Sequence, residues 1–418
     1  MGGRFATFVV AMVLGCSTPP DAQDASSDAQ VSDATEGGHY CTFDGALPDA
    51  FTPPAVDAGP STYLPQVRNA GGHVMQTPTI VPITFDSDPL QPALDDFTAA
   101  LGCSSYWQTV ASDYGIGEPV STPVHLSDPP PASMTEQSIA SFIGSAIASG
   151  TLPPPTPETI YVLYYPEGTK VTLRDGTPMC GGVTGYHEDG TASGTSIAYA
   201  VVPRCAQTGL SAIDAVTSVA SHEIIESATN PYPTHPAYGT IDADHVLWGL
   251  INGTEIADLC SLDSDAVFTP PDFPYAVQRI WSNSAAFGAH DPCIPAAAGG
   301  FFDLFPTSLS PIQADLPIGV VTSQGATLPP NGQVVVDVLA YADGFSGSWK
   351  VDVVDLAALL GGPPYLDVAV DKTSVTGGDT IHVTLTRADA SYTGVTWGII
   401  LVSTAGSIER YTYALVNM

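Results

Sequence analysis

Residues 211–231 read SAIDAVTSVASHEIIESATNP. The apolar residues of this stretch recur at spacings of three and four, namely Ile213, Val216, Val219, Ala220 and Ile224, which is the pattern of an amphipathic helix packed on a core. Ser211 is a residue type that caps helix N-termini, and the pair Asn230-Pro231 ends the pattern. The stretch therefore predicts a helix between Ser211 and Asn230.

Near the end of this helix stands the pentad His222-Glu223-Ile224-Ile225-Glu226. Positions i and i+4 lie about 40° apart around a helix axis, so His222 and Glu226 project from one face and can grip a single ion. A zincin-type hydrolase needs three protein ligands and a carboxylate that takes a proton from the attacking water. We therefore predict His222 and Glu226 as metal ligands and Glu223 as the catalytic base.

The third ligand is sought in an acidic segment further along the chain, Glu255-Ile256-Ala257-Asp258-Leu259-Cys260. Asp258 is the favoured ligand, because a disulfide between Cys260 and Cys293 would hold this segment rigid. Glu255 precedes Asp258 by three residues, so in a helical turn both side chains could face the metal, one as a ligand and one behind it. Two histidines are weaker candidates, His187 and His245.

The donor types bear on which metal the site would take. Two carboxylates and one imidazole neutralise Zn²⁺ and make its bound water harder to ionise than at a three-histidine site. Hard oxygen ligands also suit Ca²⁺ and Mn²⁺. Zinc is the expected cofactor, with calcium or manganese as alternatives, and such a site could also bind metal without catalysing a reaction.

The N-terminus predicts an exported lipoprotein. Arg4 is followed by an apolar stretch from Phe5 to Leu14 that is too short to span a bilayer, and Val13-Leu14-Gly15-Cys16 resembles a bacterial lipobox. Residues 1–15 would be a signal peptide, and the thiol of Cys16 would be acylated, so the protein would reach the membrane only through its lipid. We expect it in the cell envelope, anchored to the outer membrane or the cell surface.

Residues 16–60 are expected to form a disordered linker. The stretch from Ser17 to Pro60 is rich in acidic residues, alanine and proline, and it has no lysine or arginine. Such a segment cannot bury enough apolar surface to offset the entropy of ordering it. It would hold the folded part away from the membrane.

The charge of the chain excludes one class of partner. With 10 basic and 43 acidic residues the formal net charge is −33. Nucleic acid is excluded as a partner, because binding it depends on neutralising phosphates with basic side chains. Acidic lipid head groups are disfavoured for the same reason, because they too carry negative charge.

Six cysteines follow Cys16, an even number that suggests three disulfides in an exported protein. Six cysteines allow fifteen pairings. Order along the chain favours the pairs Cys180–Cys205, Cys260–Cys293 and Cys41–Cys103.

Residues 61–295 are long enough for one α/β or α+β domain, which the pentad marks as zincin-like. The expected strands are Thr79–Phe85, Thr159–Tyr165 and Ser196–Val202, and the expected helices are Leu90–Leu101, Tyr106–Val110 and Met134–Ser149, the last capped by Ser133. The strand Ser196–Val202 could present an edge with which an extended substrate pairs.

A run of alanine and glycine at 296–300 marks a linker, and the composition changes beyond it. Residues 302–418 show short alternating segments separated by turn signals such as Gly377-Gly378-Asp379. About seven strands in a segment of this length is typical of an antiparallel, immunoglobulin-like β-sandwich. We see no catalytic cluster in this region.

Several stretches across roughly residues 65–295 together resemble the exordium, or phosphate-induced protein, family. They include Gly71-Gly72-His73-Val74, Gly185-Tyr186-His187 after Cys180, Ser221–Glu226 with Asn230-Pro231, Glu255–Cys260, and Val277–Ser282 before Cys293. The resemblance implies an extracellular protein with a metallopeptidase-like signature, and it implies no particular substrate. The C-terminal sandwich lies outside it.

Two functions are thus expected. The first is an exported, membrane-anchored zinc metallohydrolase, a peptidase in which Glu223 activates a metal-bound water and the substrate is a peptide or a cell-surface polymer. The second is a non-catalytic cell-surface module of the same family, in which these residues hold a structural metal or form a degenerate site.

Overall fold

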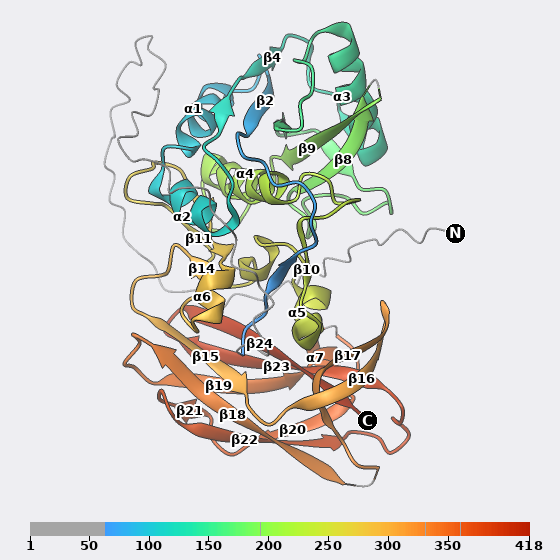
Figure 1. The fold of residues 1–418 in the computed structure, drawn as a ribbon, viewed down its shortest axis with the longest axis vertical. Coiled ribbons are helices and arrows are strands. Elements are labelled where there is room, and N and C mark those ends of the chain that lie inside the picture. The colour runs from blue at the N-terminus through green and yellow to red at the C-terminus, as the bar shows by residue number, and fades with distance from the viewer. Residues whose placement is uncertain (1–62, 193, 331, 360) are drawn as a thin grey trace.

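The computed structural model describes residues 63–418 except residues 193, 331 and 360 (Figure 1). The chain forms a mixed α/β part followed by a C-terminal part rich in β-sheet. The predicted signal peptide, the lipidation site Cys16 and the acidic linker lie outside the described residues. Within residues 63–418 as described, no helix is both long and apolar enough to cross a bilayer.

The α/β part is built on one mixed sheet with the strand order β3-β2-β6-β9-β8, and β4 also pairs with β2. The strands are β2 (Thr79–Phe85), β3 (Val120–Ser121), β4 (Val124–Leu126), β6 (Thr159–Tyr165), β8 (Tyr186–Ala192) and β9 (Thr195–Pro203). Strands β2, β6 and β9 run parallel, whereas β8 pairs antiparallel with β9. The three strands predicted in this part are confirmed.

The prediction that the strand Ser196–Val202 presents a free edge is wrong. This segment lies in β9, which pairs with β6 on one side and with β8 on the other. Its backbone groups are therefore used within the sheet, and β8 is the terminal strand on that side.

Helices cover both faces of the sheet (Figure 1). The long ones are α1 (Gln91–Leu101), α2 (Ser105–Tyr114), α3 (Glu136–Ser149) and α4 (Ala212–Thr229). Side chains of β6 alternate between two cores, as successive residues of a strand must. Ile160 and Val162 pack with α1, α2 and α4, whereas Tyr161 and Leu163 pack with α3. The result is a three-layer arrangement in which α4 lies buried against the sheet.

The limits of α4 agree with the sequence, but those of α3 do not. The Ser211 side chain accepts a hydrogen bond from the backbone N–H of Asp214, and Asn230 is the C-cap of α4. Ser133 does not cap α3, because Ser133–Thr135 forms the short strand β5, which pairs with β7 (Lys170–Thr172). Thr135 takes the capping role instead.

The rest of the α/β part consists of short elements: β1 (Val67–Asn69), β10 (Tyr238–Ile241), η1 (Ala243–His245), α5 (Val246–Ile251), η2 (Asp258–Cys260), β11 (Val267–Phe268), β12 (Val277–Gln278), β13 (Ile280–Trp281), α6 (Asn283–Phe287) and β14 (Cys293–Ile294). The predicted disulfides Cys180–Cys205 and Cys260–Cys293 are confirmed. The third predicted pair includes Cys41, which lies outside the described residues.

The C-terminal part contains two stacked sheets (Figure 1). One has the order β15 (Phe301–Pro306), β18 (Gln333–Asp343), β22 (Thr380–Arg387) and β20 (Leu366–Val370). The other has the order β16 (Ser310–Leu316), β17 (Gly319–Thr327), β24 (Ile408–Asn417), β23 (Thr396–Ala405), β19 (Trp349–Asp355) and β21 (Ser374–Val375), and the short helix α7 (Leu356–Leu359) follows β19.

The expectation of about seven antiparallel strands is wrong in two respects. The described part of this region contains ten strands, β15 to β24, and β17 pairs with β24 in parallel.

One of the hydrophobic cores extends across both parts. Trp248 of α5 packs edge-on against Tyr413 of β24, with ring centroids 4.9 Å apart. At Gly398 of β23 an added Cβ would come within 2.8 Å of the Leu247 side chain, so glycine permits the close approach of α5. The C-terminal sheets are therefore packed directly onto the α/β part, even though a run of alanine and glycine joins the two.

Candidate metal centre

Six acidic and histidine side chains gather beside the C-terminal half of α4. We call this group the site cluster. It comes from three elements: the edge strand β8, the helix α4, and the segment 255–260 that leads into η2. Its members are His187, His222, Glu223, Glu226, Glu255 and Asp258.

Helix α4 supplies the centre of the cluster. His222 and Glu226 lie one turn apart, and His222 Nε2 is 3.1 Å from Glu226 Oε2. The other carboxylate oxygen, Oε1, accepts hydrogen bonds from the backbone N–H groups of Ala257 (3.0 Å) and Asp258 (3.2 Å). Since these bonds hold the carboxylate in place, Oε2 stays directed at the imidazoles.

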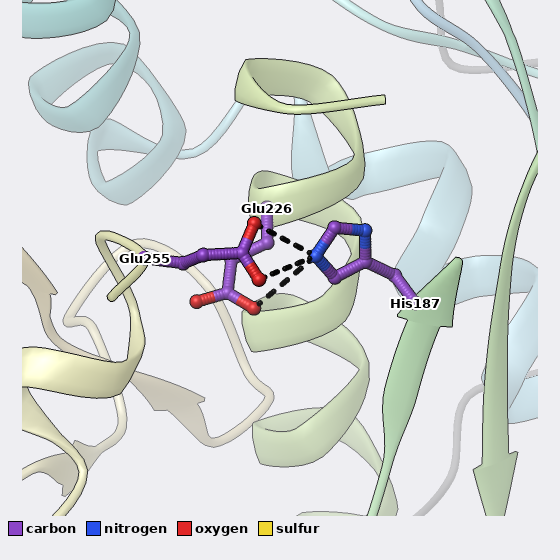
Figure 2. A group of neighbouring side chains, drawn as sticks. All are labelled: His187, Glu226 and Glu255. Carbon is purple, nitrogen blue, oxygen red and sulfur yellow. Dashed lines mark hydrogen bonds and ion pairs between the residues drawn. The ribbon is translucent and has the colours of Figure 1, made fainter. Parts of the chain in front are cut away.

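His187 approaches from the opposite side, on β8 (Figure 2). Pairing of β8 with β9 sets His187 opposite Ala200. Its Nε2 lies 2.9 and 3.0 Å from the two carboxylate oxygens of Glu255 and 3.7 Å from Glu226 Oε2. One oxygen of Glu226 therefore faces two histidines that come from different elements.

The segment 255–260 is positioned by contacts outside the cluster. The Asn230 side chain at the end of α4 donates a hydrogen bond to Glu255 Oε1 (2.6 Å). Asp258 Oδ1 lies 3.7 Å from His222 Nε2. Gly253 has a φ of +122°, and a Cβ there would overlap the Asp258 carboxylate, so glycine is required for the chain to turn this tightly.

Glu223 is buried, with 5% of its surface exposed. An oxygen of its carboxylate lies within 4.8 Å of donor atoms of both His222 and Glu226. Gly185, just before β8, makes room for this side chain, because a Cβ at that position would overlap the Glu223 carboxylate. The carboxylate thus sits beside the proposed ligands without an ion pair of its own among the described residues.

Burial and mutual repulsion shift the titration of the whole cluster. Burial opposes the charged form of His187, but the carboxylates of Glu255, Glu226 and Glu223 outweigh it and raise the pKa of the imidazole to about 10. For His222 burial is likewise outweighed, by Glu226 and Glu223, and its pKa lies well above the usual range. The histidines therefore hold protons because the surrounding carboxylates stabilise the imidazolium form.

The three carboxylates beside His222 divide into two kinds, because the pKa of Glu226 is lowered whereas the pKa values of Asp258 and Glu223 are raised. Burial acts to raise the pKa of Glu226, but the attraction of His222 outweighs burial and the pKa is lowered. This carboxylate therefore stays ionised. Burial, followed by repulsion from Glu226, holds the pKa of Asp258 well above its usual range. Burial raises the pKa of Glu223 to about 7, against the attraction of His222. Glu223 can therefore gain and lose a proton near neutral pH.

The cluster has the composition of a cation site. None of the ion pairs that it forms within the described part of the chain involves a lysine or an arginine. Buried carboxylates normally require a cationic partner, since leaving water costs several kcal/mol per ion. Imidazole and carboxylate donors separated by 2.9–3.7 Å fit metal–ligand bonds of about 2.1 Å. The residues present thus suit a divalent metal ion.

The structure brings together all the residues proposed for the site except one. His222, Glu223, Glu226, Glu255, Asp258 and His187 all lie in the cluster. The weaker candidate His245 lies elsewhere, and its Nδ1 is hydrogen-bonded to Asp242 Oδ1 (2.8 Å). It lines a separate cavity of about 590 Å³ between the α/β part and the C-terminal sheets.

Two residues that hold the cluster were not identified as such from the sequence. Gln278 contacts His222 from β12. Asn230, which the sequence marks only as the end of a helix, also binds Glu255. Both residues lie in stretches that resemble the family, but the position of an asparagine or glutamine in a sequence does not reveal which residue its side chain will contact. Comparison with known proteins adds no relative, because no family model matches the chain and no curated protein matches it.

Proposed function

We propose that the site cluster binds a divalent metal ion, in the first place zinc, and that the protein is a metallohydrolase acting on peptides. One observation carries the proposal: four carboxylates and two imidazoles lie together in a largely buried position without a lysine or arginine partner among the described residues. A divalent cation that displaces the imidazole protons would neutralise this group and bind it tightly.

Glu226 is the proposed central ligand, since its Oε2 faces both His222 and His187. These two imidazoles would complete the set of ligands at the centre. In the catalytic form only one of two further carboxylates, Glu255 next to His187 or Asp258 next to His222, would also bind the ion, and the other would lie behind it, so that a position stays open for water. Calcium and manganese are the alternatives, because the carboxylate oxygens suit them as well.

The bound cation would supply the Lewis acidity that hydrolysis of an amide requires. Glu223 would act first as the general base and then as the general acid. It would take a proton from the attacking water and deliver it to the leaving nitrogen. Its burial, which raises the pKa of the carboxyl above the usual range, suits a group that takes up and releases a proton. Its position beside His222 and Glu226, with room provided by Gly185, keeps the carboxylate near the reacting atoms.

The edge strand β8 supports a peptide as the substrate. It carries His187 and pairs with a neighbour in the sheet on one side only. An extended peptide could add to such an edge through its main chain, which would bring a scissile bond close to the cluster. A cell-surface polymer is the alternative substrate.

The proposed cellular setting follows from the sequence. We place the chain in the cell envelope, tethered through Cys16, and we assign its α/β part to a zincin-like, exordium-related fold and its C-terminal part to an immunoglobulin-like sandwich. The supporting observation is that four of the five stretches that resemble the exordium family meet at the site cluster. His187, the pentad, Glu255, Asp258 and Gln278 all contribute to the cluster or contact it.

The test is the substitution Glu223→Gln, with Glu118→Gln at an exposed position as the matched control. Loss of a general base costs roughly 10²–10⁴-fold in rate. We expect Glu223→Gln to keep its metal, measured by plasma mass spectrometry, and to lose cleavage of a fluorogenic peptide library by at least about 100-fold. Cleavage at the wild-type rate in Glu223→Gln would overturn the assigned base.

The number of donors favours a second candidate. If His187, His222, Glu226, Glu255 and Asp258 all bind one ion, little room is left for water, and the metal would be structural. The protein would then be a non-catalytic surface module. Wild-type protein that binds metal, cleaves nothing in the library, and unfolds on His222→Ala substitution would establish this second function in place of the first.

A further inference from the structure

Gln278 occupies a position where every polar atom of its backbone and side chain has a partner near α4. It lies on β12 and is buried, with 9% of its surface exposed. Its backbone N–H donates to Ser221 Oγ (3.0 Å), and its backbone carbonyl accepts from the Tyr106 hydroxyl (2.7 Å). Since Ser221 directly precedes His222, the backbone of Gln278 is attached to the same turn of α4 that carries the histidine.

The side-chain amide of Gln278 joins His222 to the segment 255–260. Nε2 donates to the carbonyl oxygen of Ala257 (2.8 Å), and Oε1 lies 3.1 Å from His222 Nδ1. A backbone carbonyl can only accept a hydrogen bond, so the amide NH₂ must face Ala257 and the amide oxygen must face His222. The His222 Nδ1 must then carry the hydrogen, because the oxygen opposite it can only accept.

These bonds close a ring through the site. His222 donates to Gln278, Gln278 donates to the Ala257 carbonyl, the Ala257 N–H donates to Glu226 Oε1, and Glu226 lies one helical turn from His222. The ring uses one polar atom of His222 and one of Glu226. The two atoms left over are His222 Nε2 and Glu226 Oε2, which lie 3.1 Å apart and face the same point.

We propose that Gln278 is a positioning residue that fixes His222 as its Nδ1–H tautomer and aims Nε2 at the metal. This inference rests on the metal centre proposed above and assigns the residue that orients one of its ligands. A hydrogen bond to the far nitrogen of a ligating histidine sets which nitrogen is free to bind and makes it more basic. Loss of such a partner typically weakens metal binding by about 10–100-fold.

The test compares three variants of the purified protein. Gln278→Met removes both side-chain bonds at similar volume, whereas Gln278→Glu keeps an acceptor for Nδ1–H. Gln66→Met is the matched control, because Gln66 is also buried and its Nε2 also donates to backbone carbonyls, those of Pro65 and Asn283, away from the cluster. Zinc affinity is measured by competition with a chromophoric chelator.

We expect Gln278→Met to bind zinc about 10–100-fold more weakly, Gln278→Glu to recover part of the loss, and Gln66→Met to bind as the wild type does. Long-range ¹H–¹⁵N spectra of the zinc-loaded protein should show the hydrogen of His222 on Nδ1. This readout is not moved by a general loss of stability.

The failures are distinguishable. If the wild type binds zinc, either of two results would overturn the role of Gln278 alone. One is unchanged zinc affinity in Gln278→Met, and the other is a hydrogen on His222 Nε2. Wild-type protein that binds no zinc would overturn the metal centre, and the role of Gln278 with it.

Discussion

Two buried groups of carboxylates lie at the two ends of the segment from Glu255 to Asp265, and they are neutralised in different ways. The site cluster at one end has only imidazoles as cationic partners among the described residues. At the other end Arg410 of β24 pairs with Asp263 (2.9 Å), Asp265 (3.5 Å) and Asp291 (3.3 Å). We call this second group the Arg410 cluster.

The difference lies in what each positive charge can do. A guanidinium keeps its proton at any pH that proteins experience, so it has no lone pair to offer and stays a fixed counter-charge. Burial raises the pKa of Asp263, and the attraction of Arg410 opposes this rise. An imidazole, by contrast, can give up its proton and bind a metal. Equally acidic surroundings therefore produce a structural ion cluster in one place and a candidate metal site in the other.

The Arg410 cluster should matter most for stability. Breaking a buried ion pair by removing one partner costs about 3–5 kcal/mol, and we expect the free energy of unfolding to fall by this amount in Arg410→Met. The loss should be equal with zinc and with a chelator, as measured by urea denaturation. The exposed Arg68→Met is the control and should change stability by less than about 0.5 kcal/mol. A loss that zinc reverses would contradict the separation of the two clusters.

The site cluster should make stability depend on metal. A ligand present at 100 times its dissociation constant stabilises the folded state by about 2.7 kcal/mol, so zinc should raise the free energy of unfolding of the wild type by about this amount relative to chelator. Arg410→Met should show the same increment, because its own cluster offers no metal ligand set. An equal increment in His222→Ala would assign the zinc to another place in the chain.

Asp258 should have a smaller effect on zinc binding than Glu226, because it lies further from His222. Asp258 Oδ1 lies 3.7 Å from His222 Nε2, whereas Glu226 Oε2 lies 3.1 Å from it. Asp258→Asn should weaken zinc binding by about tenfold, or about 1.4 kcal/mol, and Glu226→Gln should weaken it more. Both affinities can be measured by chelator competition. The reverse order would make Asp258 the principal carboxylate ligand.

The sequence predicts the parts of the site that regular structure places. His222 and Glu226 share a helix face because their spacing is four, and Glu223 follows from the pentad. Glu255 and Asp258 could be singled out because they precede a disulfide cysteine. His187 is only a weaker candidate in the sequence and Gln278 is not a candidate at all, since the pairing of β8 with β9 and the packing of β12 on α4 bring them close. Contacts between residues as far apart as the 56 positions from His222 to Gln278 leave no periodic signal.

The fold shows the same limit. The apolar strands β2 and β6 are confirmed because their burial matches their composition. Strand β17 lacks this agreement, because Val320 is exposed whereas Ser323 is buried. Ser133 is displaced as a cap because its segment pairs with β7, a long-range contact that outweighs local capping preference.

The central claim is that the site cluster, unlike the Arg410 cluster, binds a metal ion. The most direct test is the metal content of the purified protein by plasma mass spectrometry, beside His222→Ala and Arg410→Met. The account predicts near-stoichiometric zinc in the wild type and in folded Arg410→Met, and its loss in His222→Ala. Absence of bound metal from the wild type, or metal content unchanged by His222→Ala, would contradict it.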